Sequence, residues 1–303
     1  MMRILNFGSL NIDYVYSVGH MVREGETLAS GGMTVNPGGK GLNQSIALSR
    51  AGAKVCHAGL IGEDGGFLKE LLRQNGVDVS RVRDCPGKNG HAIIQVDRQS
   101  GRNCILLYGG SNQSMTKAFA EEALEGFGAE DMLLLQNEIN ELDAIIDLAY
   151  AKGMRIVLNP SPYNDRIERC DLSKVSCFLI NEVEGAQISG GREDPEEILD
   201  AIRAKYPVAE VVLTLGDRGA VYMREGERVK QRAYRVPAVD TTAAGDTFTG
   251  YFLTAMAEGR RADEAMDLAS RASAISVMRR GAAPSIPTRT EVESYGLEQE
   301  EKA

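Results

Sequence analysis

The chain has 303 residues, 43% of them apolar, which is enough to bury a large core and argues against wholesale disorder. It carries 34 basic and 43 acidic residues, a net charge of −9, and no run dense in Lys or Arg, so we expect no nucleic-acid partner. No apolar stretch reaches the roughly 18–20 residues that cross a bilayer, and the amino terminus is typical of a strand and not of a signal peptide, so we expect a cytoplasmic protein without a membrane partner.

Short apolar runs bounded by turn residues predict β-strands at residues 4–7, 55–61, 132–136, 155–159, 177–181, 211–215 and 220–223. From residue 132 onward, segments with helical periodicity separate most of these runs or follow the last of them, at 141–151, 193–205, 247–258 and 262–278. Strands that alternate with helices indicate βαβ units, and therefore an α/β domain with a mostly parallel sheet.

Two segments, 14–36 and 89–108, interrupt this pattern because apolar and polar positions alternate in them with little helical periodicity. Residues 91–96 and 103–108 are joined by a polar turn and predict an antiparallel hairpin. Such strands either extend the edge of the main sheet or form a small second sheet that covers a site as a lid. The second arrangement predicts a discontinuous β lid of residues 14–36 and 89–108 and a core of 1–13, 37–88 and 109–303.

The cysteines and histidines exclude two further kinds of site. The five cysteines are odd in number, widely spaced and contain no C-x-x-C pair, which argues against a disulfide framework and against a thiolate zinc site. None of the three histidines belongs to an H-x-x-x-H or H-E-x-x-H arrangement, so zinc hydrolase chemistry is not expected.

The most informative segment, 239–250, places small residues directly before an amphipathic helix. Ala243, Ala244 and Gly245 would lie at the helix start, where free N–H groups and the helix dipole bind anions such as phosphate. Asp246 would then stand beside that anion. Taken alone, Asp246 is equally explained as an acid that stabilises the first turn of the helix.

A second segment, 36–44, surrounds Lys40 with glycines before an apolar helix. It is not a Walker A loop, because Gly41 and not Ser or Thr follows the lysine, and no G-x-G-x-x-G joins a first strand to a helix. Lys40 and Asn43 offer donors to a polar ligand. A flexible turn into a helix explains the glycines but not these two side chains.

Together the two segments resemble the signatures of the ribokinase-like (PfkB) carbohydrate kinases, and the resemblance covers essentially the whole chain. Further matching segments are 8–13, 25–27, 59–64, 136–138, 159–162, 181–184 and 214–219. The resemblance implies an α/β fold, a three-layer sandwich in which helices flank a mostly parallel central sheet, with a small β-sheet lid.

The resemblance also implies an enzyme that transfers the γ-phosphate of ATP to a sugar hydroxyl, with D-ribose, giving D-ribose 5-phosphate, as the expected acceptor. Another acceptor remains an alternative: a fructose derivative, a deoxy sugar or a nucleoside. A non-catalytic protein of the same fold that binds a sugar or a nucleotide is a further alternative.

By this resemblance, Asp246 is the catalytic base that takes the proton of the attacking hydroxyl, and Ala243, Ala244 and Gly245 form the anion hole. The side chains and the glycine expected to bind the sugar, together with Asp246, are Asn11, Asp13, Gly39, Lys40, Asn43 and Glu138. Such side chains suit a polyol because they supply paired donors and acceptors. Singly, Asn11 and Glu138 are equally explained as turn residues at strand ends.

The residues that the resemblance assigns to ATP are Asn181, Thr214, Gly216, Gly219, Gly245 and Ser270. Glu184 is expected to hold Mg²⁺ through water, although a helix cap explains the segment 181–184 equally well. Oxygen atoms expected to bind a monovalent cation, K⁺, come from Asp240, Thr242, Ser276, Arg279, Gly281 and Ser285. The lid strands would expose apolar side chains, so we expect a homodimer that forms through the lid.

Overall fold

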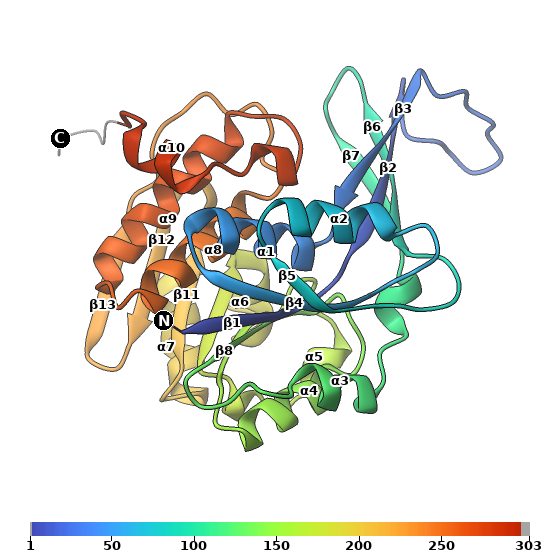
Figure 1. Cartoon of the computed structure of the whole chain (residues 1–303). Coiled ribbons are helices and arrows are strands. Elements are labelled where there is room, and N and C mark those ends of the chain that lie inside the picture. The colour runs from blue at the N-terminus through green and yellow to red at the C-terminus, as the bar shows by residue number, and fades with distance from the viewer. Residues whose placement is uncertain (1, 298–303) are drawn as a thin grey trace.

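The computed structural model describes residues 2–297, and within this range the central sheet has nine strands in the order β13-β12-β11-β10-β9-β8-β1-β4-β5. The strands are β1 Arg3–Phe7, β4 Lys54–Ile61, β5 Asp78–Asp84, β8 Met132–Gln136, β9 Arg155–Asn159, β10 Cys177–Asn181, β11 Glu210–Thr214, β12 Ala220–Arg224 and β13 Glu227–Gln231. Neighbouring strands are parallel except at one end, where β12 and β13 run antiparallel. This arrangement confirms the predicted α/β class (Figure 1). Residues 298–303 of the predicted core lie outside the described residues.

All seven strands predicted from apolar runs are present, but β5 and β13 escaped prediction. These two strands form the edges of the sheet and are rich in charged residues, with most positions exposed or half-buried. A run that is apolar throughout is expected only where both faces of the strand are covered, so edge strands lack that signal.

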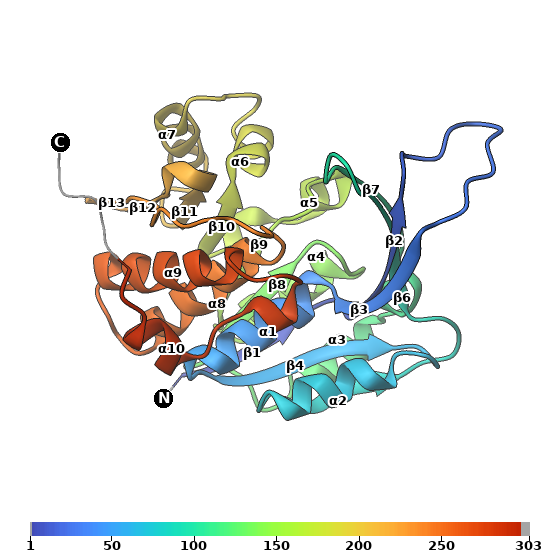
Figure 2. The ribbon, with the colours of Figure 1, turned by 90° about the horizontal axis from the view of Figure 1, so that it is seen from above.

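Helices cover both faces of the sheet (Figure 2). On one face a hydrophobic cluster joins the strands to α1 Lys40–Ala51, α2 Gly66–Gln74, α8 Ala244–Ala257, α9 Ala262–Val277 and α10 Arg289–Ser294. A second cluster, on the other face, joins them to α3 Lys117–Ala123, α4 Leu142–Ala151, α5 Asp165–Arg169, α6 Glu182–Ile188 and α7 Pro195–Lys205. Adjacent residues of one strand belong to opposite clusters, as Ile4 and Leu5 do.

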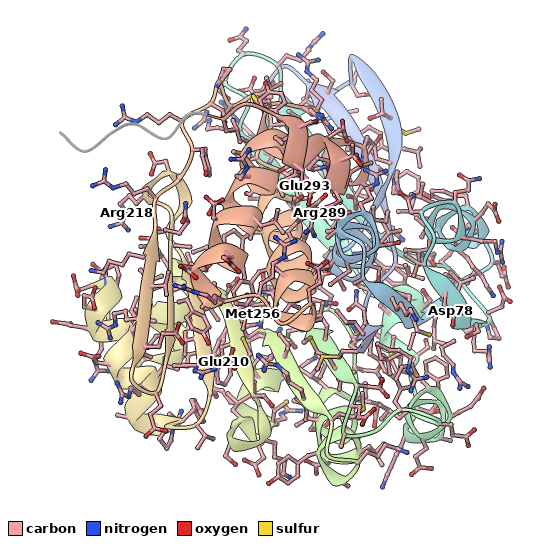
Figure 3. All side chains as sticks on the ribbon, turned by 60° about the vertical axis from the view of Figure 1, so that its left-hand side comes forward. Asp78, Glu210, Arg218, Met256, Arg289 and Glu293 are labelled. Atoms are coloured by element: carbon pink, nitrogen blue, oxygen red, sulfur yellow. The ribbon has the colours of Figure 1, made fainter. Side chains whose placement is uncertain are left out.

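The last helix, α10, is held by Arg289. Its guanidinium donates to Glu293 at 2.5 Å, to the carbonyl oxygen of Ala51 at 3.1 Å and to Glu258 at 3.4 Å (Figure 3). Ala51 ends α1 and Glu258 follows α8. These contacts therefore join the ends of two helices whose first turns line the candidate site described below.

A separate sheet of four strands stands at one side of the molecule, in the order β3-β2-β6-β7 (Figure 2). Its strands are β2 Asn11–Val18, β3 Gly32–Gly38, β6 Gly90–Asp97 and β7 Asn103–Tyr108. The predicted hairpin is confirmed, because β6 and β7 pair antiparallel with His91 opposite Tyr108. The alternative, an extension of the main sheet, is wrong. The central pair, β2 and β6, is parallel, so the small sheet is mixed.

Polar side chains end several parallel strands of the main sheet. Gln136, Asn159, Asn181 and Thr214 are the last residues of β8, β9, β10 and β11. Because these strands are parallel, the four residues lie at the same carboxyl end of the sheet, with Asn181 and Thr214 two residues beyond Gln136 and Asn159. Ligands bind at the carboxyl ends of the strands in open α/β sheets. Within residues 2–297, no helix has both the length and the apolar character of a membrane span.

Candidate active site

A cavity of about 250 Å³ lies at the carboxyl ends of the parallel strands. It is lined by side chains of the glycine-rich segment, of the strand ends and of the segment that begins α8: Lys40, Asn159, Ser161, Leu179, Ile180, Asn181, Glu184, Thr214, Thr241, Ala243, Ala244, Gly245, Asp246 and Thr249. The two segments singled out in the sequence therefore meet at one cavity, with Lys40 and Asp246 on its wall.

The start of α8 forms one wall of the cavity. The helix begins at Ala244, three residues earlier than its periodicity predicts, because its first turn consists of small residues. Ala243 precedes it in the left-handed conformation, with φ of 60°, and its carbonyl accepts the N–H of Thr247 at 2.8 Å. The N–H groups of Gly245 and Asp246 lie in the first turn, where a helix provides no carbonyl partner. The geometry at this wall therefore suits an anion.

The Asp246 carboxylate is held by two side chains of α1. Its Oδ2 accepts from Asn43 Nδ2 at 3.1 Å, and its Oδ1 accepts from Gln44 Nε2 at 2.8 Å. Asp246 is only 8% exposed. Asn43 is also buried, and its Oδ1 has no hydrogen-bond partner among the described residues. An unpartnered buried acceptor beside a carboxylate is unfavourable unless a ligand supplies the missing donor.

Of the residues predicted to bind sugar, Lys40 and Asp246 line the cavity, whereas Asn11, Asp13, Gly39, Asn43 and Glu138 do not. Asn11 and Asp13 lie within β2, so the small sheet begins before residue 14, where the predicted lid starts. Asn11 Oδ1 accepts from Asn112 Nδ2 at 2.7 Å. The Glu138 carboxylate accepts the backbone N–H of Lys40 at 2.9 Å and the hydroxyl of Ser9.

The pKa values of Asp13 and Lys40 are both raised. Burial, together with the nearby Glu138 carboxylate, raises the pKa of Asp13 to about 6. Burial favours the neutral amine of Lys40, but the carboxylates of Asp246, Glu138 and Glu184 outweigh this effect and raise its pKa. Lys40 is therefore an ammonium ion among three acidic groups. Its side chain lines the cavity beside Asn181 and Glu184, which suits a phosphate better than the predicted sugar hydroxyl.

The segment 181–184 forms a reciprocal helix cap. Asn181 Oδ1 accepts the N–H of Glu184 at 3.0 Å, and Glu184 Oε2 accepts the N–H of Asn181 at 2.9 Å. The helix cap that was the alternative explanation for residues 181–184 is therefore present. Both residues also line the cavity, and Glu184 is 5% exposed, so capping places a buried carboxylate on the cavity wall.

The other residues assigned to ATP are less closely grouped. Thr214 lines the cavity, whereas Gly216, Gly219 and Ser270 do not. Gly219 has φ of 98°, and a Cβ there would lie 2.0 Å from the carbonyl oxygen of Gln231, so the fold itself requires this glycine. Ser270 is buried in α9.

The residues assigned to the monovalent cation come from two adjacent segments. Asp240 Oδ1 accepts the N–H of Thr242 at 2.9 Å, and its Oδ2 accepts the N–H of Gly281 at 2.9 Å. Burial raises the pKa of Asp240, but these bonds outweigh it and hold the pKa below its usual range. The hydroxyls of Ser276 and Ser285 donate to the carbonyl oxygens of Ser273 and Ala282, which leaves lone pairs on the hydroxyl oxygens, and the side chain of Arg279 pairs with Glu291.

Sequence reasoning missed several residues of the site. Asn159, Ser161, Thr241 and Thr249 line the cavity without having been assigned a role. Gln44 holds Asp246 although it was read only as part of the glycine-rich segment. The available signal was its place next to Asn43 at the start of the helix that follows the glycine-rich segment.

Comparisons with known proteins show the family and the fold of this chain. A family model described as pfkB family carbohydrate kinase matches residues 1–289. A ribokinase of Haemophilus influenzae is 35% identical over 294 residues, covering 94% of this chain and 95% of the relative. The crystal structure of a ribokinase from Thermotoga maritima superposes with a TM-score of 0.86 at 32% identity, covering 97% of this chain and 99% of that one. An Arabidopsis thaliana ribokinase complexed with ribose and ATP superposes with a TM-score of 0.82 at 28% identity, covering 97% and 98%.

Proposed function

Because this chain belongs to the pfkB family of carbohydrate kinases, we propose that it transfers the γ-phosphate of ATP to the 5-hydroxyl of D-ribose. The observation that carries the proposal is the single cavity in which Asp246, the first turn of α8 and Lys40 meet. The ribokinases among its relatives, one of them bound to ribose and ATP, support this acceptor over the other sugars of the family.

In this proposal Asp246 is the general base. Its carboxylate accepts the proton of the sugar hydroxyl as the hydroxyl oxygen attacks the γ-phosphorus and the bond to the leaving ADP breaks. Ala243, Ala244 and Gly245 form the anion hole; because the Ala244 N–H donates to the carbonyl oxygen of Thr241 at 3.2 Å, the N–H groups of Ala243 and Gly245 stabilise the charge on the transferring phosphoryl group. Positioning and electrostatics then supply most of the rate enhancement.

The sugar is held between β2 and the first turn of α1. Asn11, Asp13 and Glu138 accept or donate to its hydroxyls, and Gly39 approaches it through the backbone. The unpartnered Oδ1 of Asn43 supports this placement, because a sugar hydroxyl would supply its missing donor. A sugar that lacks one hydroxyl would leave a buried polar group unpaired, and therefore bind less well.

The nucleotide lies on the other side of Asp246, with Lys40, Asn181 and Thr214 toward its phosphates. The side chains fit Mg²⁺, since Glu184 and Asp246 present carboxylate oxygens to one cavity and Glu184 is already held by its cap, which favours contact through water. When bound, Mg²⁺ neutralises charge on the phosphates. Gly216, Gly219 and Ser270 would bound the nucleoside end.

The proposal is tested by measuring ADP release with D-ribose, 2-deoxyribose, fructose, fructose 6-phosphate and inosine, each with K⁺ and with Na⁺. We expect the highest kcat/KM for D-ribose. A higher value for a nucleoside or a hexose would replace the proposed acceptor, and ADP release with none of them would favour a binding protein. K⁺ is expected to activate through oxygens of Asp240, Thr242, Ser276, Arg279, Gly281 and Ser285, and equal rates in Na⁺ and K⁺ would contradict that role.

We further propose that the small sheet is a lid and that two lids pair in a homodimer. Val35, Tyr14, Ile93 and Leu106 lie side by side across the four strands. They share the face opposite to Asp13, because neighbouring residues of a strand point to opposite faces. Leu106 is 68% exposed and Val35 and Ile93 are also exposed, so this face is an apolar surface that a second copy would cover.

Substituting Leu106→Glu is therefore expected to give a monomer at micromolar concentration, whereas the parent sediments as a dimer. Gln99→Glu adds the same charge in the exposed turn between β6 and β7 and is expected to leave the dimer intact. Analytical ultracentrifugation distinguishes the two. A monomeric parent, or an L106E variant that still dimerises, would remove this face from the interface.

We place the activity in the cytoplasm. All five cysteines, Cys56, Cys85, Cys104, Cys170 and Cys177, are free thiols. A chain with unpaired thiols, one of them exposed, suits a reducing compartment.

A further inference from the structure

A buried network of amide side chains supports the Asp246 carboxylate. Gln44 is 1% exposed and Gln136 is fully buried, and neither belongs to the cavity lining. We propose that Gln44 is a positioning residue that fixes the direction of the Asp246 carboxylate. The inference rests on the proposed function, because it requires Asp246 to be the base.

Every hydrogen-bonding atom of the Gln44 amide is in use. Its Nε2 donates to Asp246 Oδ1 at 2.8 Å and to Asn159 Oδ1 at 3.2 Å. Its Oε1 accepts from Gln136 Nε2 at 2.6 Å. Asn159 is fixed in turn, because its Nδ2 donates to the carbonyl of Leu179 at 2.8 Å. The amide of Gln44 is therefore held from three sides.

This arrangement permits only one orientation of the Gln44 amide. If the amide were turned over, its oxygen would face the Asp246 carboxylate and its Nε2 would face Gln136 Nε2, and both contacts are repulsive. Gln136 cannot turn over in compensation, because its Nε2 also donates to Asn6 Oδ1 at 2.9 Å. Asn6 Nδ2 in turn donates to the carbonyl oxygen of Gly41 at 2.8 Å, which fixes its own orientation because a carbonyl oxygen can only accept.

The fold makes room for this network at Gly8, the residue after β1. A Cβ at Gly8 would lie 2.3 Å from Gln136 Oε1. Because no side chain other than hydrogen fits there, Gly8 lets Gln136 reach Gln44. This gives a physical reason for a glycine at a position where φ does not require one.

Two α1 residues bind Asp246, and the structure separates their tasks. Asn43 keeps an unpartnered Oδ1, so it is free to turn toward a ligand. Gln44 has no amide atom left for a ligand, because Asp246, Asn159 and Gln136 occupy its amide group. Gln44 therefore acts on the base alone, and Asn43 acts on both the base and the sugar.

The test is Gln44→Met, which keeps the size of the side chain and removes its amide. We expect kcat to fall about 10- to 30-fold, the loss of one charge-assisted hydrogen bond, with the sugar KM unchanged. A fall in kcat alone marks a positioning role, because a general loss of structure would also raise the sugar KM and lower the melting temperature. The matched control is Ser49→Ala, which alters another residue of α1 whose hydroxyl donates to the carbonyl oxygen of Asn75 at 2.6 Å, outside the amide network; its kcat and sugar KM should equal those of the parent.

A Gln44→Met variant with the parent's kcat would overturn the inference, and so would an equal loss of kcat in Ser49→Ala. If Gln44→Met does not fold, Gln44→Glu keeps the shape and replaces the donor by a second carboxyl group beside Asp246, and a kcat equal to the parent's in that variant would also overturn the inference. Failure of the proposed function is distinguishable: in that case Asp246→Asn itself remains active, whereas a normal Gln44→Met beside an inactive Asp246→Asn rejects only the role of Gln44.

Discussion

Replacing Asp246 by asparagine is expected to lower kcat by about 10²- to 10⁴-fold, the usual contribution of a general base. The amide cannot accept the proton of the sugar hydroxyl, whereas the anion hole and the nucleotide contacts remain. The KM values for sugar and ATP are therefore expected to change little. A coupled assay of ADP release gives kcat and both KM values.

The substitution is well suited to the test because the structure accommodates it. In the variant, one oxygen still accepts from Gln44, and the new Nδ2 would face Asn43 Nδ2. Asn43 relieves this contact by turning its amide, because its Oδ1 has no other partner. We expect a melting temperature close to that of the parent and unchanged ATP binding in calorimetry. An Asp246→Asn variant with activity within tenfold of the parent would remove Asp246 from the role of base.

The sequence predicted those strands of the main sheet that are covered on both faces. The buried strand β8 is apolar at four of its five positions, and its residues belong to both hydrophobic clusters. A continuous apolar run of this kind indicates from the sequence alone that both faces of the strand are covered. The edge strands β5 and β13 escaped because exposure on one side admits charged residues. The parallel pairing of β2 with β6 also escaped, because it joins segments far apart in the chain and no local pattern records it.

The site was predictable where one segment carries it and not where several segments meet. The start of α8 and the position of Asp246 in its first turn follow from local sequence. The contact between Gln44 and Asp246 does not, because α1 and α8 come together only through packing in the folded core. The charges around Lys40 were likewise not predictable, because Asp246, Glu138 and Glu184 reach it from distant segments of the chain.

Replacing Asp13 by asparagine is expected to raise the sugar KM about 10- to 100-fold. At saturating sugar, kcat is expected to stay close to that of the parent. An ionised carboxylate accepts hydrogen bonds from two hydroxyl groups, and such charge-assisted bonds are the strong ones. The pKa of Asp13 lies at about 6, so the parent's sugar KM is expected to rise as the pH falls through 6. The Asp13→Asn variant should lack that dependence. Initial rates at several pH values measure both effects.

The same substitution is expected to stabilise the protein without its sugar. The folded-state pKa of about 6 lies above the ordinary value of 3.8, so the ionised carboxylate opposes folding. This cost is absent below about pH 4, grows as the pH rises and is complete above about pH 6, where it amounts to about 2–3 kcal/mol. Asp13→Asn removes it, and its melting temperature at pH 8 should exceed that of the parent, with the two values converging near pH 4.

Asp97→Asn is the matched control for this prediction, because Asp97 ends β6 of the same sheet and its pKa is shifted in the opposite direction. Hydrogen bonds from Ser100 and Gln99 lower the pKa of Asp97, so its ionised form favours folding and Asp97→Asn should melt below the parent at pH 8. Its sugar KM should not change. If Asp13→Asn instead melts below the parent at pH 8 and binds sugar normally, then Asp13 is a structural residue of β2, and sugar recognition must be sought among Asn11, Asn43 and Glu138.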